Sequence, residues 1–141
     1  MQKINKDYEI IEHTADIGIR VKARDPKELF VKTALSMFDI IAQPEIESKP
    51  SKDIEIKLKA GDLDELFVTW LNELLSLSAT KELIFSVFRI KKIGKNNLDA
   101  IVSGSDIKNY RLNTEIKAAT YHQLKLEETE SGWLAEVIFD V

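Results

Sequence analysis

Three short stretches of this sequence carry side chains able to bind a metal ion or transfer a proton. The first contains Glu12, His13 and Asp16, which lie within five positions between two apolar runs. Two carboxylates and an imidazole in one loop suit a divalent cation or an acid–base set. They equally suit the capping of backbone N–H groups in a turn. The spacing alone leaves these alternatives open.

The second stretch runs from Ile116 to His122 and holds one of the two histidines of the chain. His122 is either a hydrogen-bonded structural residue or an acid–base catalyst. Lys117 lies among apolar and small residues, so its side chain either extends to water or meets an acid. This stretch therefore contributes a candidate base and a candidate cation.

The third stretch is the end of the sequence, where Asp140 precedes the carboxylate of Val141. Two adjacent negative groups are costly unless water, a cation or a lysine screens them. A hard, oxygen-preferring ion such as Ca²⁺, Mg²⁺ or Mn²⁺ would neutralise them. The alternative is a solvated chain end with ordinary surface charges. We expect the three stretches to meet in space.

Composition limits the function classes that these residues can serve. A length of 141 residues suits one domain, here 1–141. The absence of cysteine excludes disulfides, zinc–thiolate sites and cysteine nucleophiles. A net charge of −4 argues against an autonomous grip on nucleic-acid phosphates, so we expect any RNA contact to be at most indirect.

Targeting segments and familiar catalytic motifs are absent from the sequence. No apolar run approaches the ~20 residues of a membrane helix, and residues 1–7 lack the apolar core of a signal peptide. We therefore expect a cytoplasmic protein with no membrane contact. The sequence also lacks a glycine-rich phosphate loop, a dinucleotide fingerprint, a His-Glu-x-x-His motif and a Gly-x-Ser-x-Gly motif.

Two amphipathic helices are predicted to position these stretches. The first begins at Asp25, which is a candidate N-cap followed by proline, and Glu28 completes a capping box. It is expected to end near Ala42. The second helix is capped by Asp62 and carries a strong apolar stripe that closes at Ser78.

Alternation of apolar and polar residues predicts the strands. They fall at 8–11, 17–23, 53–60, 85–91, 98–104, 123–127 and 133–140. The segments 43–52 and 105–114 are expected to be irregular. Together these elements predict an α+β two-layer sandwich, with both helices on one face of a mostly antiparallel six- or seven-stranded sheet. The last strand is expected to be tied into that sheet.

Four motifs taken together resemble the archease family. They are Glu-His-Thr-Ala-Asp-Ile-Gly at 12–18, Trp-Leu-Asn-Glu-Leu-Leu at 70–75, Ile-Lys-Ala-Ala-Thr-Tyr-His at 116–122 and Ala-Glu-Val-Ile-Phe-Asp-Val at 135–141. The resemblance extends from Tyr8 to Val141 and departs from the family pattern in the segment 104–114. It implies an accessory protein, not itself an enzyme, of the GTP-dependent RNA-splicing ligase that joins tRNA exon halves. Such a protein accelerates ligase guanylylation and allows multiple turnover.

The resemblance also implies a divalent-metal site, for which Ca²⁺ is the first expectation and Mg²⁺ or Mn²⁺ the alternatives. Its implied ligands are Asp16 and Asp140, with the Val141 carboxylate as a third. The groups expected around these ligands belong to the same motifs and are Glu12, His13, Lys117 and His122. Two other functions remain open: a metal-dependent hydrolase or nuclease that uses the same acidic pair with His122, and a general RNA or protein chaperone.

Overall fold

The computed structural model describes residues 8–12 and 16–141. Within these ranges the chain forms nine strands, two α-helices and one short 3₁₀ helix. The strands are β1 (Tyr8–Glu12), β2 (Asp16–Ala23), β3 (Ala42–Pro44), β4 (Lys52–Lys59), β5 (Leu83–Ile93), β6 (Asn97–Asp106), β7 (Tyr110–Leu112), β8 (Ala118–Thr129) and β9 (Gly132–Asp140). The helices are α1 (Pro26–Ile41), α2 (Leu63–Lys81) and the 3₁₀ helix η1 (Ile107–Asn109).

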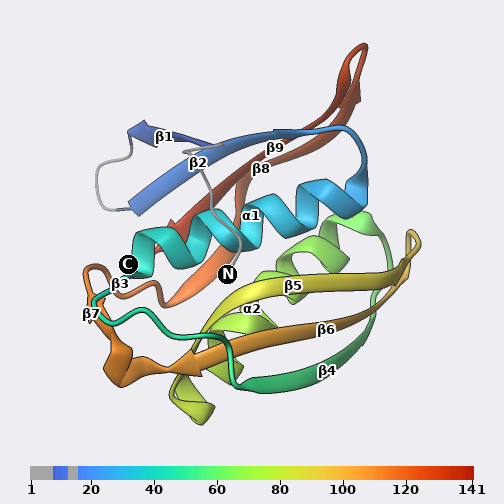
Figure 1. The fold of residues 1–141 in the computed structure, drawn as a ribbon. Helices are drawn as coiled ribbons and strands as arrows, with labels where there is room; N and C mark the ends of the chain where they lie inside the picture. The colour runs from blue at the N-terminus through green and yellow to red at the C-terminus, as the bar shows by residue number, and fades with distance from the viewer. Residues whose placement is uncertain (1–7, 13–15) are drawn as a thin grey trace.

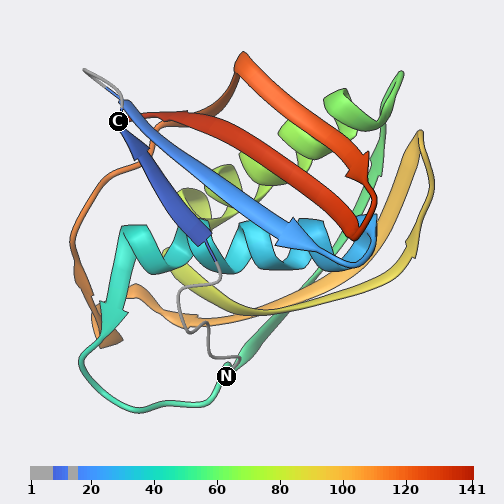
Figure 2. The same ribbon diagram turned by 90° about the horizontal axis from the view of Figure 1, so that it is seen from above.

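The two α-helices lie between two antiparallel sheets (Figures 1 and 2). One sheet has the strand order β1-β2-β9-β8 and the other β4-β6-β5, while β3 and β7 form a separate pair. Helix α1 contacts β2, β9 and β5, and α2 contacts β8, β4 and β5. Each helix therefore packs on both larger sheets, and the last strand, β9, is an inner strand of its sheet as expected.

The predicted α+β class, both helices and the antiparallel pairing are confirmed. The arrangement differs from the single sheet that we expected, because the strands form three sheets and the two larger ones cover opposite sides of the helices. The reason is the width of the apolar surface on α2. Leu66, Phe67 and Val68 are consecutive and all buried, so this helix has no fully solvated face in its middle. Strand alternation alone does not indicate which strands share a sheet.

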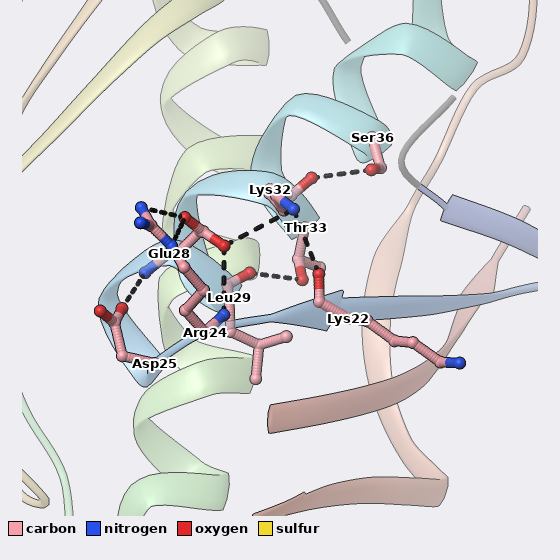
Figure 3. A network of polar contacts seen from close by, with 8 residues as sticks. All are labelled: Lys22, Arg24, Asp25, Glu28, Leu29, Lys32, Thr33 and Ser36. Carbon is pink, nitrogen blue, oxygen red and sulfur yellow. Dashed lines mark hydrogen bonds and ion pairs between the residues drawn. The ribbon is translucent and has the colours of Figure 1, made fainter. Parts of the chain in front are cut away.

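The start of α1 is fixed by the predicted cap (Figure 3). Asp25 Oδ1 accepts a hydrogen bond from the Glu28 N–H at 2.8 Å. The Glu28 carboxylate accepts from the Arg24 N–H at 3.1 Å and from the Arg24 guanidinium at 2.8 Å. Glu28 thus reaches the residue before the cap, and it also faces Lys32 Nζ at 3.6 Å.

Helix α2 begins in the same way and is joined to α1 through a buried tryptophan. Asp62 Oδ1 accepts from the Glu65 N–H at 2.8 Å, and Glu65 Oε1 accepts from the Gly61 N–H at 3.1 Å. The Trp70 indole N–H donates to the Phe30 carbonyl at 3.1 Å. Both helices are therefore held in register against each other between the sheets.

Two short strands were missed by the sequence prediction. In the segments expected to be irregular, β3 pairs with β7 through Ala42↔Leu112, Gln43↔Arg111 and Pro44↔Tyr110. Each strand has three residues, which is too short for an alternating pattern to be recognised. This pair extends directly from the end of α1 and fixes where that helix stops.

Glu28 gives a testable link between the α1 start and pH. The hydrogen bond from Arg24 lowers the pKa of Glu28. A carboxylate with a lowered folded-state pKa stabilises the fold above its unfolded pKa of about 4.3, and this contribution is lost as the pH falls through the folded value. Glu28→Gln should therefore lower the free energy of unfolding by about 0.5–1 kcal/mol at neutral pH, with little effect in acid.

Urea unfolding at pH 7 and pH 3 measures this difference. The exposed Glu47 lies in the loop before β4, and Glu47→Gln provides a control that should be near neutral at both pH values. An equal loss of stability in Glu28→Gln at both pH values would show that the ionised carboxylate is not responsible.

Candidate functional site

The candidate site lies where β2 begins and β9 ends (Figure 2). Asp16 and Asp140 are direct cross-strand partners in the antiparallel register. On the other side of β9, Ala118 is the partner of Asp140. Direct partners project from the same face of a sheet with Cβ atoms about 4.5–5.5 Å apart. The three stretches singled out in the sequence therefore meet, as expected.

The two aspartates face away from the helices. Their neighbours Ile17 and Phe139 are also register partners, and Phe139 is fully buried in the core between sheet and helices. Because side chains alternate along a strand, Asp16 and Asp140 lie on the opposite, open face. Asp140 is exposed and Asp16 is half-buried. The carboxylates are thus accessible to an ion or to a partner.

Two hydrogen bonds hold the backbone around Asp140. One comes from Lys117, which precedes β8, and the other from Thr120 in β8. The Lys117 N–H donates to the Asp140 carbonyl at 2.8 Å. Thr120 Oγ1 donates to the Ile138 carbonyl at 2.8 Å. The direction of the Asp140 side chain is therefore set by strand pairing on both sides of β9.

Within the described residues, the structure shows no ion pair that would balance the charge of the aspartate pair, since no lysine or arginine pairs with Asp16 or Asp140. Like charges directly opposite each other on a sheet are destabilising. An arrangement that tolerates this repulsion fits a group that binds a cation from solution.

A contrasting row of charges lies further along the same face. Arg20 donates from Nη1 to Glu9 at 2.9 Å and from Nε to Glu136 at 2.8 Å. These bonds, with Glu136 the larger influence, raise the pKa of Arg20. Here two carboxylates share a built-in cation, whereas the pair at the strand ends has none among the described residues.

The other predicted site residues are not register partners of the aspartate pair, or they lie outside the described part of the chain. Glu12 ends β1 with its backbone opposite Ile17. The Glu12 side chain and His13 lie outside the described part of the chain. Val141 is half-buried and packs on the core. Within the described ranges, no three or more His, Asp or Glu side chains form a metal-binding group.

His122 is not in the same cross-strand row as the aspartates. The β8–β9 register shifts between Thr120 and Lys125, and within this irregular segment Gln123 adopts a φ of 51°. His122 lies in that segment and is exposed. The adjacent Tyr121 is exposed and lies near the acidic start of α2. Partial burial, followed by the charges of Glu65, Asp62 and Asp64, raises the pKa of its phenol. The polar residues of 116–122 therefore do not gather at one site.

Asn72 is the residue of this region that sequence reasoning missed. Its position beside the apolar stripe of α2 predicts a surface residue, but its side chain is half-buried against β8. Its Oδ1 accepts from the Ala119 N–H at 2.8 Å, and its Nδ2 donates to the Ala119 carbonyl at 3.1 Å. One amide thus takes the place of a neighbouring strand along the outer edge of β8. The only sequence signal was an amide residue beside the apolar stripe.

These features define an α+β protein with two helices enclosed by antiparallel sheets and an acidic pair at one sheet end. The model of the archease protein family matches residues 8–141. Protein archease of Methanosarcina acetivorans is 38% identical over 148 residues that cover all of both chains. Protein archease of Pyrococcus furiosus is 37% identical over 143 residues, which is 96% of this chain and 99% of that one. The chain belongs to the archease family.

Two solved structures share the fold. Protein 1598 of Methanobacterium thermoautotrophicum superimposes with a TM-score of 0.77 at 29% identity, over 96% of this chain and 99% of that one. The Thermotoga maritima archease, described as a possible chaperone, gives a TM-score of 0.67 at 26% identity, over 100% and 98%. In the described part of this chain, no helix combines the length and apolarity needed to cross a membrane.

The Asn72 contact predicts a local effect on the edge of β8. Asn72→Ala leaves the N–H and carbonyl of Ala119 without their partners, which should lower the free energy of unfolding by about 1–3 kcal/mol. Amide hydrogen exchange at Ala119 should accelerate in parallel. Ser76, one turn further along α2, is exposed, so Ser76→Ala is the matched control and should change neither quantity. Unchanged protection of Ala119 in Asn72→Ala would refute the contact.

Proposed function

We propose that this archease is a non-enzymatic, cytoplasmic accessory protein of the GTP-dependent RNA-splicing ligase in tRNA splicing. In this role it promotes ligase guanylylation and multiple turnover. The observation that carries the proposal is the register pair Asp16–Asp140, two carboxylates on an open sheet face with no cationic partner among the described residues. Family membership supplies the context.

The donor groups at this sheet end suit a hard divalent cation. Asp16 and Asp140 supply carboxylate oxygens, and the carboxylate of Val141 follows directly in the sequence. Ca²⁺ takes about 6–8 oxygen ligands, which is more than these three groups provide. The remaining positions would be filled by water or by groups of a partner. Ca²⁺ is the ion we favour, with Mg²⁺ and Mn²⁺ as alternatives.

A bound ion would supply positive charge that attracts phosphate or carboxylate groups of the ligase and its nucleotide. The residues of this chain have separate roles in the proposal. The Lys117 N–H holds the end of β9, and the exposed Lys117 side chain is available to anionic groups of a partner. Glu12 and His13 would shape the approach to Asp16 from the segment that precedes it.

Two alternative functions receive less support. A metal-dependent hydrolase would need a base beside the acidic pair, but His122 lies in the irregular segment of β8 and not in the row of Asp16 and Asp140. A general chaperone role is suggested by the description of the Thermotoga maritima relative. It assigns no task to an acidic pair of this geometry.

Ligase guanylylation tests the proposal directly. The chain is mixed with a GTP-dependent RNA-splicing ligase and GTP, and the covalent guanylate is followed with and without a divalent cation. Asp16→Asn and Asp140→Asn should each reduce the stimulation at least about tenfold. A loss of this size is expected when one group that supports a bound metal is removed. Both variants should fold normally, because each removes a like-charge repulsion.

The exposed Asp64 in the first turn of α2 provides the matched control, since it lies in the helix layer away from the pair. Asp64→Asn should retain full stimulation. Full stimulation by folded Asp16→Asn and Asp140→Asn together would overturn the proposed role of the acidic pair.

A further inference from the structure

The second large sheet carries a concentration of positive charge near the β5–β6 turn. Lys57 and Lys59 come from β4, Lys91 and Lys92 from β5, and Lys95 from the turn itself, and all five are exposed. The helices cover only the opposite side of this sheet (Figure 1). We call these five residues the lysine face.

A β-bulge increases the density of lysines on this side. Lys57 and Lys92 are both register partners of Asp99, one from each neighbouring strand. The β5–β6 register shifts between Ile90 and Lys92, so Lys91 is an extra residue at this point. In a bulge two residues oppose one on the partner strand, which leaves Lys91 and Lys92 together opposite Asp99. Three lysines therefore occupy the register positions beside one aspartate.

The single carboxylate at the centre offsets only part of this charge. Asp99 Oδ1 is buried and accepts no hydrogen bond from the described residues. Lys57 Nζ lies 3.6 Å from Glu55, and the other four lysines form no ion pair within the described part of the chain. Their ammonium groups are thus available to an external anion.

The chain is acidic overall because its 24 acidic residues outnumber its 20 lysines and arginines, but these charges are unevenly distributed. The carboxylates of Asp62, Asp64 and Glu65 lie at the start of α2, and the Asp16–Asp140 pair lies on the other large sheet. The net charge of −4 therefore does not describe the lysine face. A local surplus of lysine attracts anions over about one Debye length, roughly 8–10 Å at moderate salt.

The other side chains of this face narrow the choice of partner. The outward positions of β4, β5 and β6 carry Ile101 and Val87 but no aromatic ring, because Phe85 and Phe88 face the core. Protein interfaces depend on buried aromatic or arginine anchors, and base recognition depends on stacking. The one arginine of these three strands, Arg89, is exposed and lies 3.9 Å from Asp53, so it is not a buried anchor. Exposed lysines without a buried anchor or a stacking ring suit a repeating phosphate backbone.

We propose that the lysine face binds the phosphate backbone of RNA without sequence preference. Phosphate binding stands on the structure of this face alone, whereas the choice of RNA over DNA rests on the proposed function beside an RNA ligase. The inference replaces the expectation from net charge that RNA contact is at most indirect. It assigns different roles to the two large sheets. The acidic pair on one sheet would bind a metal ion, and the lysines on the other would bind phosphates.

Fluorescence anisotropy of a labelled 20-nucleotide oligouridine, titrated with the full chain between 25 and 200 mM NaCl, tests this inference. The double variant Lys59→Glu/Lys92→Glu should bind at least tenfold more weakly at low salt. In single Lys→Gln variants of the face, the slope of log affinity against log salt should fall by about 0.7 for each lost contact. Asp99→Asn should bind more tightly than the natural chain, because it removes the one negative charge at the centre.

The matched control is Lys49→Glu/Lys125→Glu, two exposed lysines outside the face that undergo the same change in net charge. This control should retain at least half of the affinity. Absence of binding at 25 mM NaCl, an equal loss in the control, or equally tight binding of a polyglutamate peptide would each overturn the inference. The last outcome would identify an acidic protein as the partner.

RNA-free guanylylation separates this inference from the proposed function. The folded variant Lys59→Glu/Lys92→Glu should still stimulate guanylylation when no RNA is present. If Asp16→Asn keeps full stimulation while the lysine variant loses RNA binding, the proposed function fails and this inference stands. If the lysine variant keeps its RNA affinity while Asp16→Asn loses stimulation, this inference fails and the proposed function stands.

Discussion

The pairing of β9 between β2 and β8 is the constraint on which the rest of this structure depends. Phe139 is fully buried in the core, so the register of β9 is fixed by the side chain next to Asp140. A shift by one residue would place the carboxylate in the core and the phenyl ring in water. The burial of Phe139 therefore holds Asp140 opposite Asp16 on the open face.

Charge balance differs between cross-strand rows, and the unbalanced rows are those to which we assign function. In the row of Arg20, one guanidinium forms ion pairs with two glutamates, so these charges have partners within the row. The Asp16–Asp140 row has two negative charges, and the row of Asp99 has an excess of lysines. Folding gains little from either of these arrangements. An external cation and an external polyanion are the groups that would complete them.

Local features of the fold were predictable from the sequence, whereas the packing of its layers was not. The α1 start follows from Asp25 and Glu28, which interact within a single turn. The alternation of apolar and polar residues identified the seven longer strands, because this pattern also depends only on residues close together in the sequence. The layer order, the Asn72 contact and the bulge at Lys91 depend on residues far apart in sequence. No local pattern reports such pairings.

The site was predictable in part. Asp16 and Asp140 were expected to meet because each belongs to a motif of the resemblance, and the register places them opposite each other. His122 was equally conspicuous in the sequence, but the irregular β8 segment separates it from that row. Residue type thus identified candidates, and strand register decided which of them share a location.

Calcium-dependent thermal unfolding, compared between the natural chain and Asp16→Asn, tests the central claim most directly. We predict that the natural chain is stabilised as Ca²⁺ is added, by about 2.7 kcal/mol at a concentration 100-fold above the dissociation constant. The Asp16→Asn variant should lose this response and, without the ion, be at least as stable as the natural chain because the repulsion is gone. Equal stabilisation of both proteins by the ion would contradict the claim, as would an ion-free Asp16→Asn variant that is markedly less stable.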